Sequence, residues 1–166
     1  MKNKIIADHG GWLEVDVSTN MYPNSTMKID TDDWNYISSA FRATVSTSRH
    51  GYAGFYKNRL THLLVHRVLI PCDGVIDHIN GDGLDNRRKN IRPCSVQENS
   101  RNRHGQANNT SGFVGVCWNC ASKKWYARIC VSGKNINLGL FSDIEDAICA
   151  RIKAEKKIFG EFAPQR

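Results

Sequence analysis

The 166-residue sequence lacks any long hydrophobic run. Its longest apolar stretch, residues 63–70, is interrupted by His66 and Arg67, whereas a membrane-spanning helix needs about 20 apolar residues. The basic start of the chain resembles a signal peptide, but Asp8 ends the first apolar run after three residues. We therefore expect a cytoplasmic protein without membrane contact.

The chain also lacks the cysteine pairs of a zinc ribbon. Of its six cysteines, only Cys117 and Cys120 have the two-residue spacing of a zinc knuckle, and no second pair of that kind follows. In a reducing compartment, unpaired cysteines behave as small buried hydrophobic residues. We expect free thiols, with structural zinc as the less favoured alternative.

Acidic residues are in the minority. The chain has 23 Lys and Arg against 16 Asp and Glu, a net charge of +7, so an acidic polymer is the natural partner. Residues 61–166 carry most of the excess, with sixteen basic and ten acidic side chains. With 40% hydrophobic residues, the charge belongs to a folded protein, and the length excludes a single large enzyme barrel.

The basic side chains are densest between residues 87 and 103. Glu98 is the only acidic residue in this stretch, against Arg87, Arg88, Lys89, Arg92, Arg101 and Arg103. A charge run is usually a solvated face, but this imbalance indicates phosphate contacts.

Residues 1–59 predict a small mixed scaffold in which no chemistry is visible. Alternation at Leu13, Val15 and Val17 predicts a strand, and Thr31 before an apolar pattern predicts a short capped helix. Further extended segments are expected at 43–46, 52–56 and 63–69.

Residues 60–104 predict a strand, a loop, a second strand and a helix. The strands are expected at 75–78 and 89–93, and the loop between them is rich in Asn, Asp and Gly. Ser95 and Glu98 have the spacing of a capping box, which predicts a helix over 96–103. The loop is not an EF-hand, because Leu84 and Ile91 stand where calcium ligands are required.

Asp77, His78 and Asn99 are the candidates for a functional site in this segment. A carboxylate and an amide oxygen are hard ligands that suit Mg²⁺, which also accepts a substrate phosphate. A neutral His78 could take a proton from an attacking water. The alternative is that Asp77 and His78 are an ordinary polar pair at a strand end.

The segments "LVHRVLI" and "VIDHINGDGLDNRRKNIRPCSVQENSRNR" closely resemble the HNH endonucleases of phage and bacterial homing type. The resemblance implies a ββα-metal fold that binds one divalent cation, Mg²⁺ or Mn²⁺. It makes His78 the general base, Asp77 and Asn99 the metal ligands, and Asn90 a residue that orients the imidazole through the loop.

The same resemblance covers four further residues. His66 and Arg67 match the His-Arg pair that precedes the motif in this family, which is expected either near the scissile phosphate or in the scaffold. Asn102 and Arg103 match a later family feature and are expected to contact phosphate.

Residues 105–111 have the composition of a linker, and 112–163 predict a three-stranded sheet with one helix. Strands are expected at 113–118, 125–131 and 135–141, and a capping box at Ser142 and Glu145 predicts a helix that ends before Gly160.

Residues 111–163 resemble the ethylene-response-factor type of DNA-binding domain, whose sheet lies in the major groove. The residues expected to contact DNA on this basis are Lys123, Lys124, Trp125, Arg128 and Lys134. The alternative is that the lysines only solubilise the fold. This chain has Asn137 near the position where the plant pattern has its second Trp, so the base contacts of that Trp cannot be transferred.

Together these observations predict an α+β protein with an N-terminal scaffold (1–59), an HNH module (60–104), a linker (105–111) and a DNA-binding domain (112–163). The expected function is Mg²⁺-dependent cleavage of double-stranded DNA in a phage-infected or bacterial cell, and no obligate protein partner is implied. The main alternative is a regulator that binds DNA without cutting it. An RNA-directed protein is less favoured because the sequence offers no aromatic platform for single strands.

Overall fold

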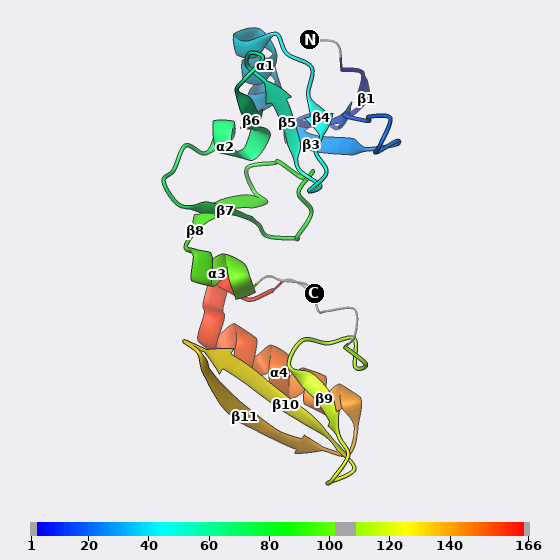
Figure 1. Cartoon of the computed structure of the whole chain (residues 1–166), viewed down its shortest axis with the longest axis vertical. Helices are drawn as coiled ribbons and strands as arrows, with labels where there is room; N and C mark the ends of the chain where they lie inside the picture. The colour runs from blue at the N-terminus through cyan, green and yellow to red at the C-terminus, as the bar shows by residue number, and fades with distance from the viewer. Residues whose placement is uncertain (1–2, 102–108, 165–166) are drawn as a thin grey trace. The chain divides into compact units, whose positions relative to one another are not determined.

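The computed structural model describes residues 3–101 and 109–164, and it divides the chain into two compact units. The first unit extends to Asn99 and the second begins at Ser100. Both combine antiparallel sheets with helices, which confirms the predicted α+β class (Figure 1).

The first unit begins with an antiparallel sheet and a helix. The sheet has the order β1-β2-β3, and its elements are β1 (Ile5–Asp8), β2 (Trp12–Asp16), β3 (Thr26–Asp30) and the following helix α1 (Thr31–Phe41). Burial alternates along β2 and β3 because successive strand residues point to opposite faces. Asp30, not the predicted Thr31, is the N-cap of α1, since its backbone is extended and Thr31 is already helical.

A second small sheet follows, made of β4 (Ser46–Thr47), β5 (Ala53–Tyr56) and β6 (His62–Leu64). The prediction of one extended segment over 63–69 is wrong, because the chain turns into helix α2 (Val65–Leu69) after Leu64. Val65 and Leu69 are four residues apart and both buried, so helical geometry places two apolar side chains of this run on one face.

The predicted strand–loop–strand–helix segment is present. It consists of the hairpin strands β7 (Val75–His78) and β8 (Ile91–Cys94) and helix α3 (Val96–Arg101). The capping box is confirmed: the Glu98 N–H donates to Oγ of Ser95 at 3.2 Å, and the Ser95 N–H donates to the Glu98 carboxylate at 2.8 Å.

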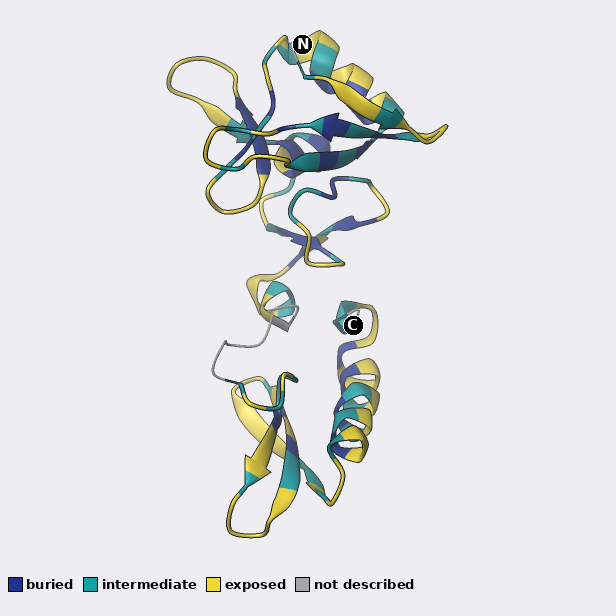
Figure 2. Cartoon of the chain, turned by 90° about the vertical axis from the view of Figure 1, so that its right-hand side faces the viewer, coloured by how far each residue is buried: buried dark blue, intermediate teal, exposed yellow. Residues whose placement is uncertain are grey.

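One hydrophobic core holds the first unit together. It extends in sequence from Leu13 to Ile91 and includes Phe55, Val65 and Ile76, so the predicted segments 1–59 and 60–104 share it. Figure 2 shows the buried residues gathered on the strands of this unit. The hairpin β7–β8 is therefore built on the N-terminal scaffold.

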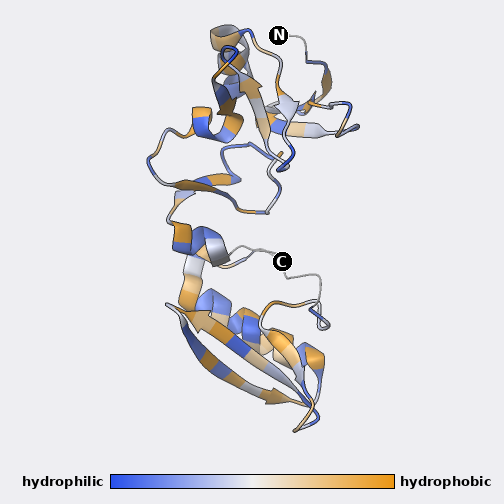
Figure 3. Cartoon of the chain, viewed as in Figure 1, coloured by the Kyte–Doolittle hydropathy of each residue, from blue (hydrophilic) through white to orange (hydrophobic). Residues whose placement is uncertain are grey.

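The second unit is a three-stranded antiparallel sheet with one long helix. The strands β9 (Val116–Asn119), β10 (Lys124–Val131) and β11 (Lys134–Phe141) have the order β11-β10-β9, and helix α4 (Ile144–Phe159) and the short 3₁₀ helix η1 (Gly160–Phe162) follow. Polar and apolar residues alternate along β10 and β11 in Figure 3, and the apolar side packs with α4 around Val116, Ala127 and Ala147.

The start of α4 differs from the prediction. Asp143 is the N-cap instead of Ser142, because its carboxylate accepts a hydrogen bond from the Glu145 N–H at 2.7 Å. Gly160 ends the helix at a positive φ of 54°. None of the helices in residues 3–101 and 109–164 has the length and apolarity required to cross a membrane.

Candidate functional site

The loop between β7 and β8 is held by Asn90. Its side-chain oxygen accepts from the Asn80 N–H at 3.1 Å, and its amide nitrogen donates to Oδ1 of Asn80 at 2.9 Å and to the Asp85 carbonyl at 2.8 Å. Asn90 is only 7% exposed. These bonds fix the loop that begins directly after His78.

The far side of this loop is attached to strand β3. The Lys28 N–H donates to the Leu84 carbonyl at 2.9 Å, and the Asn86 N–H donates to the Lys28 carbonyl at 2.7 Å. The loop therefore continues the first sheet beyond the edge of β3. Segments that lie more than fifty residues apart in the sequence fix one another here.

His78 lies at the end of β7 and faces the interior. Its ring centroid is 5.0 Å from that of His66 and 5.7 Å from that of Tyr52, and both histidines are 5% exposed. Burial lowers the pKa of His78, although the side chain of Asn86 and nearby carboxylates partly oppose the shift. A neutral imidazole is thus favoured at physiological pH.

Asp77 leaves the strand on the opposite face. It is paired in register with Arg92, whose Nε and Nη2 donate to Oδ2 of Asp77 at 3.1 and 2.8 Å. Cys94 lies on the same face, since it is two residues beyond Arg92 in the strand. Burial raises the pKa of Cys94, the nearby Asp77 carboxylate adds to this shift, and the adjacent backbone N–H of Asn99 opposes it. The Asn99 N–H donates to the Ser95 carbonyl at 3.0 Å. The first turns of α3 therefore lie on the Asp77 side of the hairpin.

Asp77 and Asn99 are the two residues that the resemblance assigns to a cation. Within the described parts of the chain, no three His, Cys, Asp or Glu side chains gather into a group that could hold a metal. Asp77 offers a carboxylate that already attracts a cationic group, and half-buried Asn99 offers an amide oxygen on α3. One carboxylate, one amide, waters and a substrate phosphate are the ligands that Mg²⁺ accepts.

Arg87 and Arg88 have structural partners that the sequence did not predict. Arg87 donates from Nε to Oδ1 of Asp85 at 2.7 Å, and its guanidinium lies 4.5 Å from the centre of the Trp12 ring. Although burial opposes it, this hydrogen bond lowers the pKa of Asp85. Arg88 donates to both carboxylate oxygens of Asp33, at 2.8 and 3.2 Å. Both arginines therefore have carboxylate partners within the fold, and the Arg88 side chain is still 56% exposed. Their phosphate contacts stay a prediction.

The other predicted contacts near the motif are separated by the fold. His66 is buried against His78, whereas Arg67 is exposed and donates from Nη1 to the Gly74 carbonyl at 3.1 Å. Burial, with smaller effects of His78 and Arg67, lowers the pKa of His66 to about 4. Asn102 and Arg103 lie outside the described residues.

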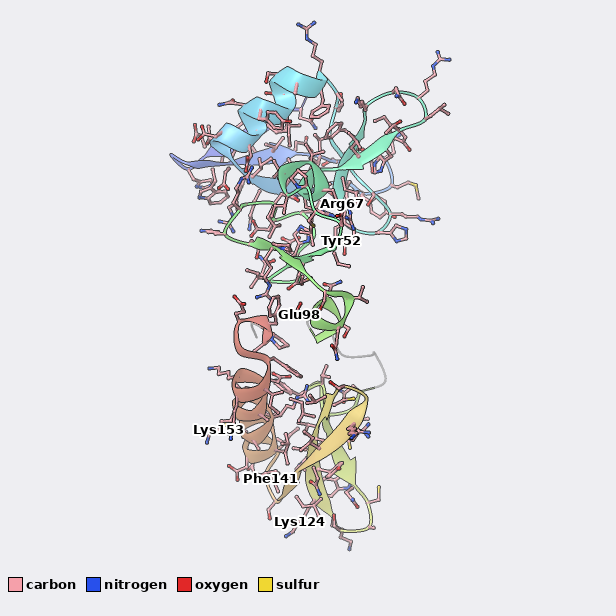
Figure 4. The ribbon with its side chains drawn as sticks, turned by 90° about the vertical axis from the view of Figure 1, so that its left-hand side faces the viewer. Tyr52, Arg67, Glu98, Lys124, Phe141 and Lys153 are labelled. Carbon is pink, nitrogen blue, oxygen red and sulfur yellow. The ribbon has the colours of Figure 1, made fainter. Side chains whose placement is uncertain are left out.

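In the second unit, Lys124 and Arg128 share the sheet face that points away from α4. They are four residues apart on β10 and both exposed (Lys124 is labelled in Figure 4). Lys123 and Lys134 are exposed at the two turns that flank β10. The prediction for Trp125 is wrong: it packs against the core that includes α4, with its ring 5.2 Å from that of Trp118.

Two site residues escaped the sequence analysis. Tyr52 precedes β5 and contacts both His66 and His78, at ring distances of 5.3 and 5.7 Å (Figure 4). Arg92 was counted only as part of a basic run, although it is the partner of Asp77. Strand pairing could have suggested Arg92, whereas no local signal identifies Tyr52.

Comparison with known proteins shows a similarity to a phage protein. The chain is 30% identical to Protein 3.8 of Escherichia phage T7 over 118 residues, which are 69% of this chain and 97% of that protein. No model of a protein family matches the sequence. No solved structure matches it either.

Proposed function

The chain belongs to the family of Protein 3.8 of Escherichia phage T7, and we propose that it is a metal-dependent endonuclease that hydrolyses phosphodiester bonds of double-stranded DNA. The observation that carries the proposal is the end of strand β7. There His78 is buried and favoured in its neutral form, and the buried carboxylate of Asp77 lies on the other face of the strand. The loop that follows them is fixed by Asn90. The resemblance of residues 75–103 to HNH endonucleases supports the same assignment.

His78 is the proposed general base. Its lowered pKa leaves the imidazole unprotonated and able to accept a proton from water. The water oxygen then forms a bond to phosphorus, the bond from phosphorus to the 3′ oxygen breaks, and a 5′-phosphate and a 3′-hydroxyl result. Asn90 positions this base indirectly, because it fixes the loop that follows it.

Asp77 and Asn99 are the proposed ligands of the cation. When bound, Mg²⁺ would supply positive charge for the phosphate oxygens and the departing 3′ oxygen. The Arg92 guanidinium occupies Oδ2 of Asp77, so a cation at this carboxylate would share it with Arg92 or displace Arg92. A freed Arg92 would be available to the phosphate itself, which a guanidinium binds well.

The second unit is the proposed DNA-binding module. Residues 99–142 contain no Asp or Glu, and Lys124 and Arg128 stand on the sheet face opposite α4. Such a face would not repel a phosphate backbone, and an arginine there can bind guanine in the major groove. This surface would hold and select the duplex that the first unit cleaves.

The direct test is incubation of the full chain with supercoiled plasmid DNA and Mg²⁺. We expect nicked or linear products that EDTA abolishes. The variant His78→Ala should cut about 10²- to 10⁴-fold more slowly while its affinity for DNA stays unchanged, since a general base acts only in the chemical step. Exposed His50→Ala is the matched control. Equal activity of His78→Ala and the wild type would refute the assignment.

One observation favours a second candidate, a regulator that binds DNA without cleaving it. The Arg92–Asp77 ion pair gives the carboxylate a cationic partner within the fold. If that pair persists with DNA and Mg²⁺ present, no cation would reach Asp77. Tight DNA binding with no cleavage of any plasmid in Mg²⁺ or Mn²⁺ would select this candidate.

A further inference from the structure

A long segment of the first unit contains no acidic residue. From Trp34 to Cys72 the sequence has neither Asp nor Glu, whereas it has five basic side chains, namely Arg42, Arg49, Lys57, Arg59 and Arg67. The net charge of the N-terminal third does not reveal this segment, because all the acidic residues of that third come before Trp34. The acid-free segment includes sheet β4-β5-β6 and α2.

The centre of this segment is a protruding hairpin. Strand β4 pairs only with Ala53 and Gly54, so the end of the sheet from Phe55 to Leu63 is a two-stranded ribbon of β5 and β6 (Figure 1). Its tip, residues 57–61, is entirely exposed, and the side chain of Leu60 is the most exposed large hydrophobic residue described, at 96%.

The tip has a defined conformation. Oδ1 of Asn58 accepts hydrogen bonds from the Leu60 and Thr61 N–H groups at 3.0 and 2.8 Å, and the Lys57 N–H donates to the Thr61 carbonyl at 2.9 Å. An Asn that bonds its own backbone in this way fixes a turn. Leu60 is therefore presented to solvent by an ordered loop.

The side chains around the tip are those that contact nucleic acid. Lys57 and Arg59 have no carboxylate partner among the described ion pairs, so both charges are available to a ligand. At the base of the tip, Tyr56 is 62% exposed and its ring lies 4.9 Å from that of His62. The patch formed by Tyr56, Lys57, Arg59, Leu60 and His62 is called the hairpin patch below.

We propose that the hairpin patch is a second DNA-binding surface, which places the β5–β6 ribbon in the major groove beside the cleavage site. A two-stranded ribbon fits the major groove, which is about 12 Å wide, and exceeds the minor groove of about 6 Å. Lys57 and Arg59 bind phosphates, and Leu60 contacts base edges such as the thymine methyl group. This inference rests on the proposed DNA-directed function.

The distance to the candidate site fits one duplex. Tyr52 contacts His78 directly and precedes β5, and Tyr56 ends the same strand. At about 3.3 Å per residue, these two tyrosines are about 13 Å apart along the strand, which corresponds to roughly four base pairs. A duplex whose phosphate lies at His78 therefore passes within half a helical turn of the hairpin patch.

The test measures binding of the full chain to a fluorescent duplex of mixed sequence in EDTA, over a range of salt concentrations. We expect Lys57→Ala/Arg59→Ala to reduce the slope of log affinity against log salt by about 1.8, or 0.9 per phosphate contact. Leu60→Ala should weaken binding roughly fivefold and leave the slope unchanged, because it removes apolar contact and no charge. Since these side chains are exposed, the variants should fold normally.

Matched controls separate the hairpin patch from general effects. Lys156→Ala/Lys157→Ala removes two exposed charges from α4, and Met21→Ala shortens another exposed apolar side chain; both should bind like the wild type. If the hairpin variants bind the duplex with wild-type affinity and slope, or if the wild type binds only single-stranded RNA, the inference is overturned.

The outcome is independent of catalysis, because EDTA prevents cleavage and a plasmid assay in Mg²⁺ is scored separately. Hairpin-dependent binding without cleavage would refute the nuclease and support the hairpin patch. Cleavage by the wild type, with no effect of the hairpin variants on binding, would support the nuclease and refute the hairpin patch.

Discussion

Arg92 donates two hydrogen bonds to the same oxygen of Asp77, from Nε at 3.1 Å and from Nη2 at 2.8 Å. The side chains are 15% and 3% exposed, and they lie directly opposite in the β7–β8 register. The carboxylate assigned to the cation is thus already neutralised by the fold. A divalent cation would have to share this carboxylate with Arg92 or displace Arg92 from it.

The first prediction concerns this competition. In EDTA, Arg92→Ala should lower the free energy of unfolding by about 3 kcal/mol, because a buried carboxylate loses its counter-ion. Mg²⁺ should then raise the melting temperature of Arg92→Ala more than that of the wild type. Thermal melts with and without Mg²⁺ measure the difference, and Asp77→Asn/Arg92→Ala, which lacks the carboxylate, is the control. An identical Mg²⁺ response in wild type and Arg92→Ala would remove Asp77 from the ligand set.

The second prediction concerns Asn90. Asn90→Ala removes three hydrogen bonds within the loop, so we expect a loss of about 2–3 kcal/mol in unfolding free energy and a large loss of cleavage. Urea unfolding and the plasmid assay measure the two effects. Asn35→Ala, at an exposed position of α1 outside this loop, serves as the control for cleavage. Full activity in Asn90→Ala would show that the loop needs no such support.

The third prediction follows from the lowered pKa of His66. Between pH 6.5 and about 4 the unfolded state binds a proton at this histidine and the folded state does not, so stability falls as the pH falls through this window. The loss amounts to up to about 3 kcal/mol. Urea unfolding at pH 7 and pH 4.5 should show a smaller difference for His66→Gln than for the wild type. His50→Gln, at an exposed position, should retain the wild-type difference.

The fourth prediction concerns the second unit, where Arg151 and Glu155 form an ion pair on α4 with exposures of only 6% and 2%. Arg151 also donates from Nη1 to the Arg128 carbonyl at 2.6 Å, at the irregularity in β10. Arg151→Met should cost about 3–5 kcal/mol, because Glu155 stays buried without its partner. Arg151→Met/Glu155→Leu should recover most of that loss in urea unfolding. A double variant as unstable as the single one would contradict this explanation.

Local patterns predicted the elements that depend on nearby residues. The capping box of α3 joins Ser95 to Glu98, three positions away, and the strand at 75–78 follows from a short apolar run before a turn cluster. The segment at 65–69 was misjudged because a β-branched, apolar run suits a strand as well as a short buried helix. The N-caps were displaced by one residue for a similar reason, since neighbouring polar residues compete for that position.

Contacts between distant segments account for what the sequence could not predict. The partner of Arg88 is Asp33, 55 positions earlier, so the basic run did not reveal that part of it is bonded to the scaffold. Tyr52 contacts His78 only because the start of β5 lies beside α2 and the β7–β8 hairpin in the folded unit. In the second unit, the alternation in β10 did not reveal which of its two faces α4 covers, so Trp125 was assigned to the wrong one.

The bonds between β3 and the loop after β7 also determine how the proposed nuclease module could be moved to another protein. Lys28 exchanges two backbone hydrogen bonds with the loop, and Arg88 donates to Asp33 in α1. A fragment that begins at residue 60 would therefore lack β3 and α1, which hold the loop of the motif in place. Recombination or protein engineering that moves the motif intact must therefore include the N-terminal sheet.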